Sequence, residues 1–393
     1  MKPSHKIRPV FDDPNLVSSA GLVPALRLAE SAGLDDLLDG LTVPSPNAGA
    51  KMTCVIGGML AGADAEGIAM LDVDDTVREV HGYAKQGAAF GYTKQRGLNI
   101  QLAVVSTPLT APVIARARLR SGNTASAKGA GRMLAQALTT ARAAGVNGTV
   151  LCRADSAYYG WAFVGTAIRH KAWFSVTARM TKTVTSAIAS IPTEVWQPIE
   201  YPNAIYDEAE QRWVSDAEVA EVGFIAFTGR RKHEHVPCRL VVRRVKRLAP
   251  LASDGTEQGE LFATYRHHAF ITNSTLPMVE ADQRHRDHAL VEQVIAELKD
   301  GPLAHLPSGK YAANAAWVAL AAIAFNLARA TGVAASMHRA RWASLRKKII
   351  DVPARIASTA RRLDLHMPAD WPWATSWEAL WSTATGPPAA ARA

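Results

Sequence analysis

The stretches IAMLDVD at Ile68–Asp74 and GTVLCRAD at Gly148–Asp155 decide the fold of this chain. Each is a short apolar run that ends in an aspartate, which is typical of a buried strand leading to a polar sheet edge. Side chains alternate between the two faces of a strand, so Asp72 and Asp74 are expected on one face and Asp75 on the other. The aspartates at the ends of these two strands are therefore the first candidates for chemistry.

The elements around these strands predict a mixed α/β order. Strands are expected at Phe90–Lys94 and Gly97–Thr107, which with the first strand make a three-stranded meander. A helix over roughly Ala127–Ala144 precedes the strand that ends in Asp155, and a helix at Ala157–His170 and a strand at Ala172–Ala178 follow it. Three antiparallel strands followed by helix, strand, helix and strand is the order of the ribonuclease-H-like fold. In that fold, helices flank both faces of a mixed sheet.

The chain is expected to have five parts. They are a helical N-terminal region (1–66), the first half of the α/β domain (67–181), a β-rich insertion (182–268), the second half of the domain (269–350) and a helical, Trp-rich tail (351–393). Helices outside the first half are expected at Val23–Ala32, Leu34–Leu41, Lys51–Ala63, Met278–Asp300, Ala312–Ala330 and His338–Lys348. Further strands are expected at Val222–Phe227, Cys238–Arg244, Leu261–Arg266 and Ala269–Asn273.

Composition and charge narrow the class of protein. Hydrophobic residues make up 48% of the chain and charged residues 20%, which is a globular composition and excludes wholesale disorder. The three cysteines form no CxxC pair, so neither a disulfide framework nor a cysteine-rich zinc site is predicted. The N-terminus has no secretory h-region, and Ala312–Ala330 is too polar to be predicted as membrane-spanning. The formal charge of +9 makes a polyanion a plausible partner.

Several carboxylates are placed where they could carry chemistry. Asp74 and Asp155 end strands, and Glu292 shares a helix face with His285, His288 and Lys299. Three converging carboxylates would hold two Mg²⁺ ions about 3.5–4 Å apart, as enzymes that break phosphodiester bonds do. The alternatives remain open, because an acid at a strand end often caps the next helix and a polar helix face is often only solvated.

Five segments of the chain together carry a resemblance to a known family. They are LDVDDTVREVHGYAKQGAAFGYTK (71–94), VLCRADSAYY (150–159), FITN (270–273), HRDHALVEQVIAELKDGPLAHLPSG (285–309) and NAAWVALAAIAFNLAR (314–329). They resemble the DDE transposases of bacterial insertion sequences, in the group numbered 1380, a relative of the group numbered 4. The resemblance covers nearly the whole chain from Leu71 onward.

The resemblance implies a catalytic triad. The family's first acid lies in an Asp-x-Thr context, which is Asp74 here, and its second precedes a serine, which is Asp155 here. The third belongs to a Tyr-x2-Arg-x3-Glu-x6-Lys signature, which reads His285-x2-His288-x3-Glu292-x6-Lys299 in this chain. The implied activity is Mg²⁺-dependent cleavage and strand transfer of DNA. Two ions would be held by the three acids, and Mn²⁺ could substitute for Mg²⁺.

The resemblance also implies contacts with DNA. The residues predicted to make them are His285, Arg286, His288 and Lys299 around the signature, and Arg243, Arg244, Lys246 and Arg247 in the insertion. For the insertion residues, a solvated basic strand edge is an equal alternative. Two histidines replace the signature's Tyr and Arg. A neutral histidine has no guanidinium fork, so binding of DNA ends is expected to be weaker or differently organised.

The implied partners are double-stranded DNA, as terminal inverted repeats and target, and a second copy of the chain in the DNA complex. No nucleotide cofactor is predicted, because neither GxxxxGK[ST] nor a usable GxGxxG occurs. No membrane is predicted, and the expected location is the bacterial cytoplasm, at the nucleoid. The N-terminal DNA-binding region resembles a shortened form of the family's. A degenerate copy that binds DNA without transposing it is therefore the alternative, and a general ribonuclease-H-like nuclease is a third hypothesis.

Overall fold

The computed structural model describes residues 15–33, 67–82, 84–199, 205–207, 212–214, 217–246, 265–359 and 362–386. The helices expected at Leu34–Leu41 and Lys51–Ala63 lie outside these ranges. The chain forms two compact units, one made of Met1–Gly40 with Phe325–Ala393 and the other of Leu41–Ala324. The division into five functional parts expected from the sequence stays a prediction.

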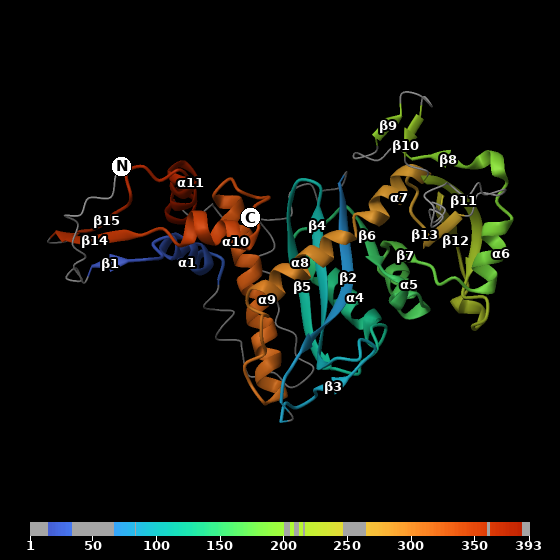
Figure 1. The fold of residues 1–393 in the computed structure, drawn as a ribbon, viewed down its shortest axis with the longest axis horizontal. Coiled ribbons are helices and arrows are strands. Elements are labelled where there is room, and N and C mark those ends of the chain that lie inside the picture. The colour runs from blue at the N-terminus through green and yellow to red at the C-terminus, as the bar shows by residue number, and fades with distance from the viewer. Residues whose placement is uncertain are drawn as a thin grey trace, which may run out of the picture. The chain divides into compact units, whose positions relative to one another are not determined.

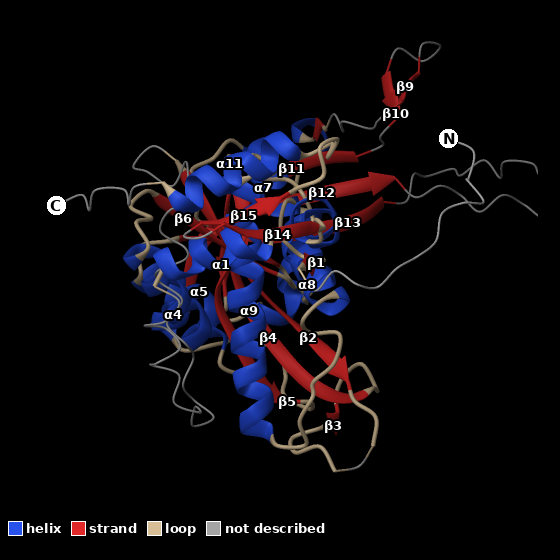
Figure 2. Ribbon diagram, turned by 90° about the vertical axis from the view of Figure 1, so that its left-hand side faces the viewer, coloured by secondary structure: helices blue, strands red, loops and turns tan. Residues whose placement is uncertain are grey.

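A ten-stranded mixed sheet is the centre of the larger unit. Its strands are β2 (Ile68–Glu79), β3 (Ala89–Phe90), β4 (Arg96–Thr107), β5 (Thr110–Ser121), β6 (Thr149–Ala154), β7 (Trp173–Thr177), β8 (Gln197–Pro198), β11 (Ala217–Ala226), β12 (Val236–Lys246) and β13 (Tyr265–Thr272). The order is β3-β4-β2-β6-β7-β13-β12-β11-β8, and β5 also pairs with β4. The strands β2, β6 and β7 run parallel, and the other pairs are antiparallel. The strands of the predicted insertion therefore extend the central sheet (Figure 2).

Helices flank this sheet. They are α4 (Ala130–Ala143), α5 (Trp161–Arg169), α6 (Lys182–Ala189), α7 (Met278–Arg286), α8 (Ala289–Asp300) and α9 (Tyr311–Ala334). Helix α4 packs against β2, β4 and β5, and α5 packs against β7 and α4. Helix α8 crosses the strands in Figure 1 and packs against β2, while α7 packs against β11 and β12. A separate two-stranded hairpin is formed by β9 (Ile205–Asp207) and β10 (Arg212–Val214).

The meander differs from the prediction in its third strand. The expected strand at Phe90–Lys94 is reduced to β3, and the third long strand is β5, which the sequence pattern did not predict. Pro112 makes a strand at this position hard to predict, because proline donates no ladder hydrogen bond. In the structure, Pro112 falls where the register of β5 shifts against Val105 and Thr107 of β4, so the ladder tolerates it.

The helix predicted over Met278–Asp300 is wrong as one continuous element. It is broken into α7 and α8 at Asp287 and His288. The predicted helix Ala157–His170 is likewise a 3-10 turn, η1 (Ser156–Tyr158), followed by α5. At each of these two interruptions, a side chain forms a hydrogen bond with an aspartate of β2. The pairs are His288 with Asp72 and Tyr158 with Asp75. Local helix propensity is overridden by these tertiary contacts.

The smaller unit is built from both ends of the chain. It contains β1 (Leu16–Val17), α1 (Leu22–Ser31), α10 (Trp342–Leu345), a π-helical turn (Arg346–Ile350), β14 (Ala354–Thr359), β15 (Arg362–His366) and α11 (Ala374–Thr385). The strands form an antiparallel sheet in the order β1-β14-β15. Leu345, Ile349, Trp377 and Leu380 are buried in its core, and the other tail tryptophans, Trp371, Trp373 and Trp381, pack against that core.

Helix α9 is long and apolar enough to cross a membrane by length and composition alone, with a mean hydropathy of 1.5. A core helix of a soluble protein passes the same test. Its polar side chains Asn314, Asn326 and Arg329 are all buried. The Asn314 side chain hydrogen-bonds both the N–H and the C=O of Ser308, so this polar group is satisfied within the protein.

Candidate active site

Asp74 and Asp155 lie side by side at one end of the parallel strands. Asp72 of β2 pairs in register with Arg153 of β6, and a candidate acid follows two residues after each of them. Asp155 comes directly after β6, whereas the prediction that Asp74 ends its strand is wrong, because pairing with β4 extends β2 to Glu79. Burial, with the negative charge of Asp155 adding to it, raises the pKa of Asp74 to about 6. Burial also raises the pKa of Asp155. The structure therefore brings together two of the three predicted catalytic acids.

No basic side chain forms an ion pair with either of these two acids in the described ranges. Asp74 accepts a hydrogen bond of 2.7 Å from the N–H of Asp75, and Asp155 accepts one of 3.0 Å from the N–H of Ala157. Backbone N–H groups only partly offset two adjacent negative charges. Carboxylate oxygens in this state are the hard ligands that Mg²⁺ and Mn²⁺ prefer, so the donor set fits a divalent cation.

The neighbouring Asp72, by contrast, is fully paired. Arg153 donates to both of its carboxylate oxygens, each at 2.7 Å, and His288 Nδ1 lies 2.8 Å from Oδ1. Burial alone would raise the pKa of Asp72, but the positive charges of Arg153 and His288 outweigh burial and lower it. For His288, burial acts to lower the pKa, and the hydrogen bond and charge of Asp72 raise it. Asp72 is therefore an ionised, anchored carboxylate.

Asp75 is the centre of a second buried network, on the opposite face of β2. Its carboxylate forms an ion pair of 3.0 Å with Arg120 and accepts a 2.7 Å hydrogen bond from the Tyr158 hydroxyl. Asn99 of β4 donates to the same carboxylate. Asp72 contacts His288, whereas Asp75 contacts Arg120 and Tyr158, so the predicted placement of Asp72 and Asp75 on opposite faces is confirmed.

Glu292, the third predicted acid, is exposed on α8. It follows His288 by one turn and precedes Lys299 by about two turns, so the three share a helix face. His288 and Lys299 both lie close enough to Asp74 to interact with its charge. In the described part of the chain, however, no three His, Cys, Asp or Glu side chains are grouped so that they could hold a metal ion. The assignment of Glu292 to the site stays a prediction.

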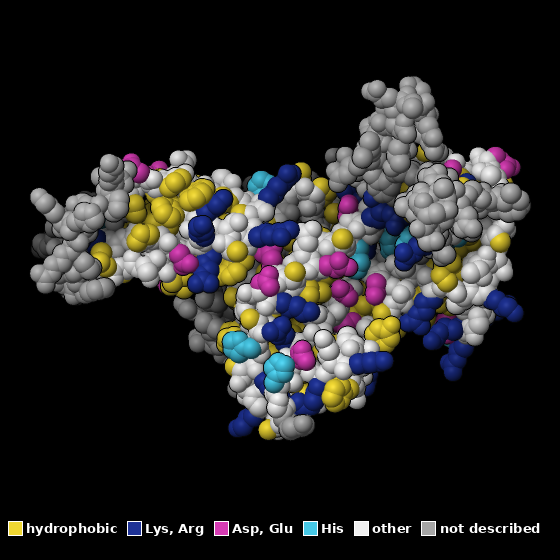
Figure 3. All heavy atoms as spheres, in the orientation of Figure 1, with side chains coloured by type: hydrophobic (Ala, Val, Ile, Leu, Met, Phe, Trp, Pro, Cys, Tyr) yellow, Lys and Arg dark blue, Asp and Glu magenta, His cyan; other side chains and the backbone are white. Residues whose placement is uncertain are grey.

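Figure 3 shows acidic side chains gathered over α8 and the adjoining strands, with Lys and Arg side chains spread on either side of them.

A family model described as transposase DDE domain group 1 matches residues 61–384. That span is more than half of the 393 residues. The chain belongs to this DDE transposase family. A comparison with curated proteins finds no match. Membership supports a transposase function and implies that the chain binds DNA.

The predicted DNA-binding residues of the transposase differ in their exposure and in whether another group of the protein already binds them. Lys299 is partly exposed near Asp74, and burial lowers its pKa. Arg286 forms an ion pair of 2.8 Å with Asp282 on the same helix. His285 is half-buried, with Nδ1 2.8 Å from Ser175 Oγ and Nε2 3.1 Å from Thr177 Oγ1. Both ring nitrogens of His285 are thus engaged inside the protein.

The residues of the insertion that are predicted to contact DNA lie on β12 or directly after it. Arg244 forms an ion pair of 2.6 Å with Glu218, and its guanidinium stacks 4.2 Å from the ring centre of Trp196. Arg243 is half-buried on the same strand. The Lys246 side chain and all of Arg247 lie outside the described residues. DNA contact by this group of four stays a prediction.

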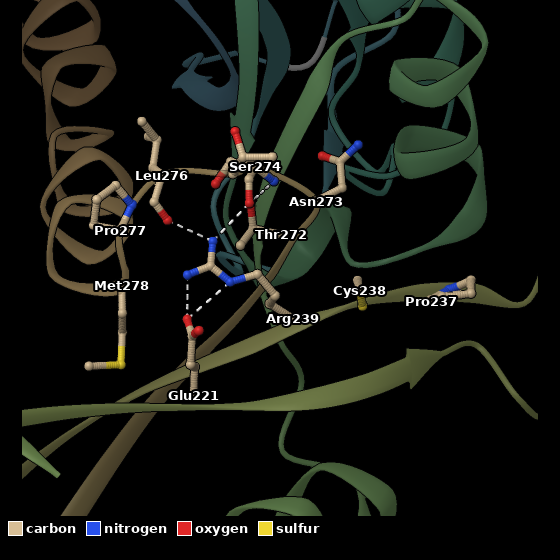
Figure 4. Close-up of a pocket in the computed structure, with 11 residues that line it drawn as sticks. Glu221, Pro237, Cys238, Arg239, Thr272, Asn273, Ser274, Leu276, Pro277 and Met278 are labelled. Carbon is tan, nitrogen blue, oxygen red and sulfur yellow. Dashed lines mark hydrogen bonds and ion pairs between the residues drawn. The ribbon is translucent and has the colours of Figure 1, made fainter. Parts of the chain in front are cut away.

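A hollow of about 560 Å³ lies where β11, β12 and β13 meet the start of α7 (Figure 4), and neither Asp74 nor Asp155 lines it. Arg239 crosses it, pairing with Glu221 and donating bonds of 2.8 Å to the carbonyls of Ser274 and Leu276. Its charged groups satisfy one another, and no predicted site residue of the transposase lines it. The hollow is not a second candidate for the active site.

The groups that hold the aspartates in place were not predicted from the sequence. They are Asp72 and Arg153 on one face and Arg120 and Tyr158 on the other, with Arg179 donating to the carbonyls of Ser156 and Ala157 beside Asp155. A signal existed for the first pair. Charged residues inside apolar strands are buried only when paired, so Asp72 in LDVD and Arg153 in LCRAD could have been matched.

Proposed function

We propose that this protein is an insertion-sequence transposase that hydrolyses a phosphodiester at the transposon end and joins the freed 3′ hydroxyl to target DNA. The observation that carries the proposal is the contrast among four aspartates. Asp72 and Asp75 are each paired with an arginine, whereas Asp74 and Asp155 are paired with no basic side chain in the described ranges. A site that concentrates unpaired negative charge in a DNA-binding protein is suited to divalent cations.

The residues have distinct roles in this proposal. Asp74, Asp155 and Glu292 hold two Mg²⁺ ions, or Mn²⁺ in their place, and the ions when bound supply charge and alignment for phosphodiester hydrolysis. Lys299 contacts a DNA phosphate near the cleavage site as a point charge. Arg286, with Arg243, Arg244, Lys246 and Arg247, contributes contacts to the DNA backbone, which require sequence-independent charge rather than base recognition.

The proposal also covers the protein's group within the family, its fold, its assembly on DNA and its location in the cell. We assign it to the group numbered 1380 and its sheet to the ribonuclease-H-like fold. The parallel strands β2, β6 and β7 beside the antiparallel β4 and β5 support the fold assignment, and the signature spacing around Glu292 supports the group. A homodimer on double-stranded DNA follows from the need to cut two transposon ends together. The bacterial cytoplasm, at the nucleoid, is the expected location for such a protein.

Cleavage of end-labelled duplexes taken from the two flanks of the gene tests the proposal. Each duplex is incubated with Mg²⁺, Mn²⁺ or EDTA. Wild type is compared with Asp74→Asn, Asp155→Asn and Glu292→Ala, and with Glu297→Ala as a control acid on another face of α8. We expect metal-dependent nicking at one boundary, lost in the first three variants and kept in the control. Full activity of Glu292→Ala would remove Glu292 from the triad.

A degenerate, DNA-binding copy is the second candidate. The observation that favours it is the loss of the signature's Tyr and Arg. His285 is held between two hydroxyls and His288 is held by Asp72, so neither ring takes over the phosphate contacts of the lost Tyr and Arg. This candidate predicts binding that weakens steeply with salt and no metal-dependent cleavage of any duplex.

A further inference from the structure

Two long stretches of the larger unit contain no acidic residue. Residues 80–154 include ten Lys and Arg and no Asp or Glu, and residues 301–324 include one Lys and again no acid. The formal charge of the whole chain is +9, so the first stretch carries the excess of positive charge. Arg120 and Arg153 are used inside the protein, where they pair with aspartates of β2. The positions of the remaining cations therefore decide which face of the unit attracts a polyanion.

Loops of these two stretches meet at one end of the sheet, where β2 ends and β4 begins (Figure 2). The N–H of Gln86 donates a hydrogen bond of 2.9 Å to the carbonyl of Gly309, and the N–H of Gly122 donates one of 3.0 Å to that of Gly87. A Cβ on Gly91 would lie 2.4 Å from the carbonyl oxygen of Gly122, so the backbones touch there as well. These contacts join three loops into one surface, here called the loop surface: residues 84–95, 122–129 and 301–310.

The exposed side chains of the loop surface are of the kinds that contact phosphates. A turn is closed by a hydrogen bond of 3.0 Å from the N–H of Lys94 to the carbonyl of Gly91, and it leaves Tyr92 fully exposed. Further exposed side chains on the three loops include Thr93, Lys94, Gln95, Lys128 and Lys310. Lys, Thr, Gln and Tyr side chains are common donors to phosphate oxygens. The loop surface itself contains no acidic residue that would repel a phosphate, and Figure 3 shows Lys and Arg side chains around the position of β3.

Lys94 has an unusual backbone conformation for a lysine. Its φ is 57°, in the left-handed region that glycine or asparagine adopts at a lower cost. Residues with strained backbones concentrate at functional sites, where the strain is held by the surrounding structure. Lys94 is exposed, so the strained turn places a positive charge on the loop surface. This conformation marks the turn as a site where the side chain has a task.

The loop surface lies beyond Asp74 along β2. Asp74 comes five residues before Glu79, where β2 ends, and a strand rises about 3.3 Å per residue, so this end of β2 is about 17 Å from the acid. Successive phosphates of one DNA strand are about 3.4 Å apart along the helix axis, so this distance corresponds to about five base pairs. A duplex cut beside Asp74 therefore reaches the loop surface within about half a helical turn.

We propose that the loop surface binds the phosphate backbone of double-stranded DNA next to the cleavage site. Lys94, Lys128 and Lys310 pair with phosphates, and the hydroxyl of Tyr92 donates a hydrogen bond to a phosphate oxygen. Contacts of this kind position the duplex without reading its sequence. The inference adds a surface to the proposed function and rests on it, because it takes the cleaved DNA as the ligand.

Anisotropy of a fluorescent duplex from the flank of the gene, measured in EDTA at several salt concentrations, tests the proposal without cleavage. Lys94→Asn removes the charge and keeps a residue that accepts the left-handed backbone. It should weaken binding about 3- to 10-fold at about 0.1 M salt and lower the slope of log K against log salt by about 0.9. Lys171→Asn is the matched control. Lys171 is exposed and also left-handed, with φ 54°, but it precedes β7, at the opposite end of the parallel strands. It should bind as wild type does.

Lys128→Gln tests a second loop independently and should act as Lys94→Asn does. If both variants bind DNA as tightly as Lys171→Asn, the loop surface does not contact DNA and the inference is overturned, while the proposed function stands. If wild type binds no duplex at any salt concentration, the proposed function fails as well. Unchanged DNA affinity together with dissociation of a dimer in sedimentation would assign the loop surface to a second copy of the chain and would also overturn the inference.

Discussion

The Tyr158 hydroxyl donates a hydrogen bond of 2.7 Å to Oδ1 of Asp75. Asp75 follows Asp74 on β2, and Tyr158 lies three residues after Asp155 in the turn η1. One bond between side chains on the opposite face of β2 thus ties together the backbone segments that present the two unpaired acids. Arg120 completes the network with a 3.0 Å ion pair to Asp75.

Removing this hydroxyl is expected to loosen the acidic pair. Tyr158→Phe should lower the free energy of unfolding by about 1–2 kcal/mol, because Asp75 loses one buried hydrogen bond. It should also weaken Mn²⁺ binding by about 10-fold, measured by calorimetric titration, since outer groups orient metal ligands. Tyr159→Phe is the matched control, because the ring of Tyr159 packs beside Phe227. Equal Mn²⁺ affinity in both variants would show that the bond does not position the site.

The pairing of Asp72 with Arg153 is expected to be critical for stability. Arg153→Met leaves the buried Asp72 carboxylate without its arginine, with only His288 beside it, and should cost about 3–5 kcal/mol in urea unfolding followed by tryptophan fluorescence. The double variant Asp72→Asn/Arg153→Met removes both charges and should recover a large part of that loss. If the double variant is no more stable than Arg153→Met, the cost arises from lost packing of the arginine rather than from the orphaned charge.

The acidic pair is expected to reduce the stability of the metal-free protein. The pKa of Asp74 is raised to about 6, so at pH 7.5 its ionised form destabilises the folded state. Asp74→Asn removes that charge and should raise the free energy of unfolding in EDTA by about 1–2 kcal/mol. Saturating Mn²⁺ should stabilise wild type and not the variant. Thermal melts in EDTA and Mn²⁺ measure both effects, and a less stable Asp74→Asn in EDTA would contradict the expectation.

His285 is expected to make stability depend on pH. Burial, together with the charges of His288 and Arg153, lowers its pKa from 6.5 to about 3. Between these two values the unfolded chain binds a proton that the folded chain does not, so the free energy of unfolding falls as the pH falls. The slope from this group is at most about 1.4 kcal/mol per pH unit. Urea unfolding at several pH values should show a shallower slope for His285→Gln, and parallel curves would refute the assignment.

Much of the α/β order could be predicted because it depends on short apolar runs. Strands were expected at Ile68–Asp74, Gly148–Asp155 and Ala172–Ala178, and the structure has β2, β6 and β7 there. β5 was not predicted, because Pro112 and three alternating arginines interrupt the apolar pattern that is typical of a buried strand. Such a strand is stabilised by its pairing with β4 and not by its own pattern.

The sequence by itself determined where the apolar runs of β2 and β6 lie and which aspartates follow them, because apolar runs and side-chain alternation are local properties. It did not determine where β2 ends, because the strand continues past Asp74 to Glu79. Only the tertiary structure decided which aspartates are paired. Asp72 meets Arg153 through the register of two strands far apart in the chain, and His288 reaches Asp72 only where the predicted helix breaks. Asp74 and Asp155 are set apart by this arrangement, because the partners that neutralise a buried charge come from distant segments that only folding brings together.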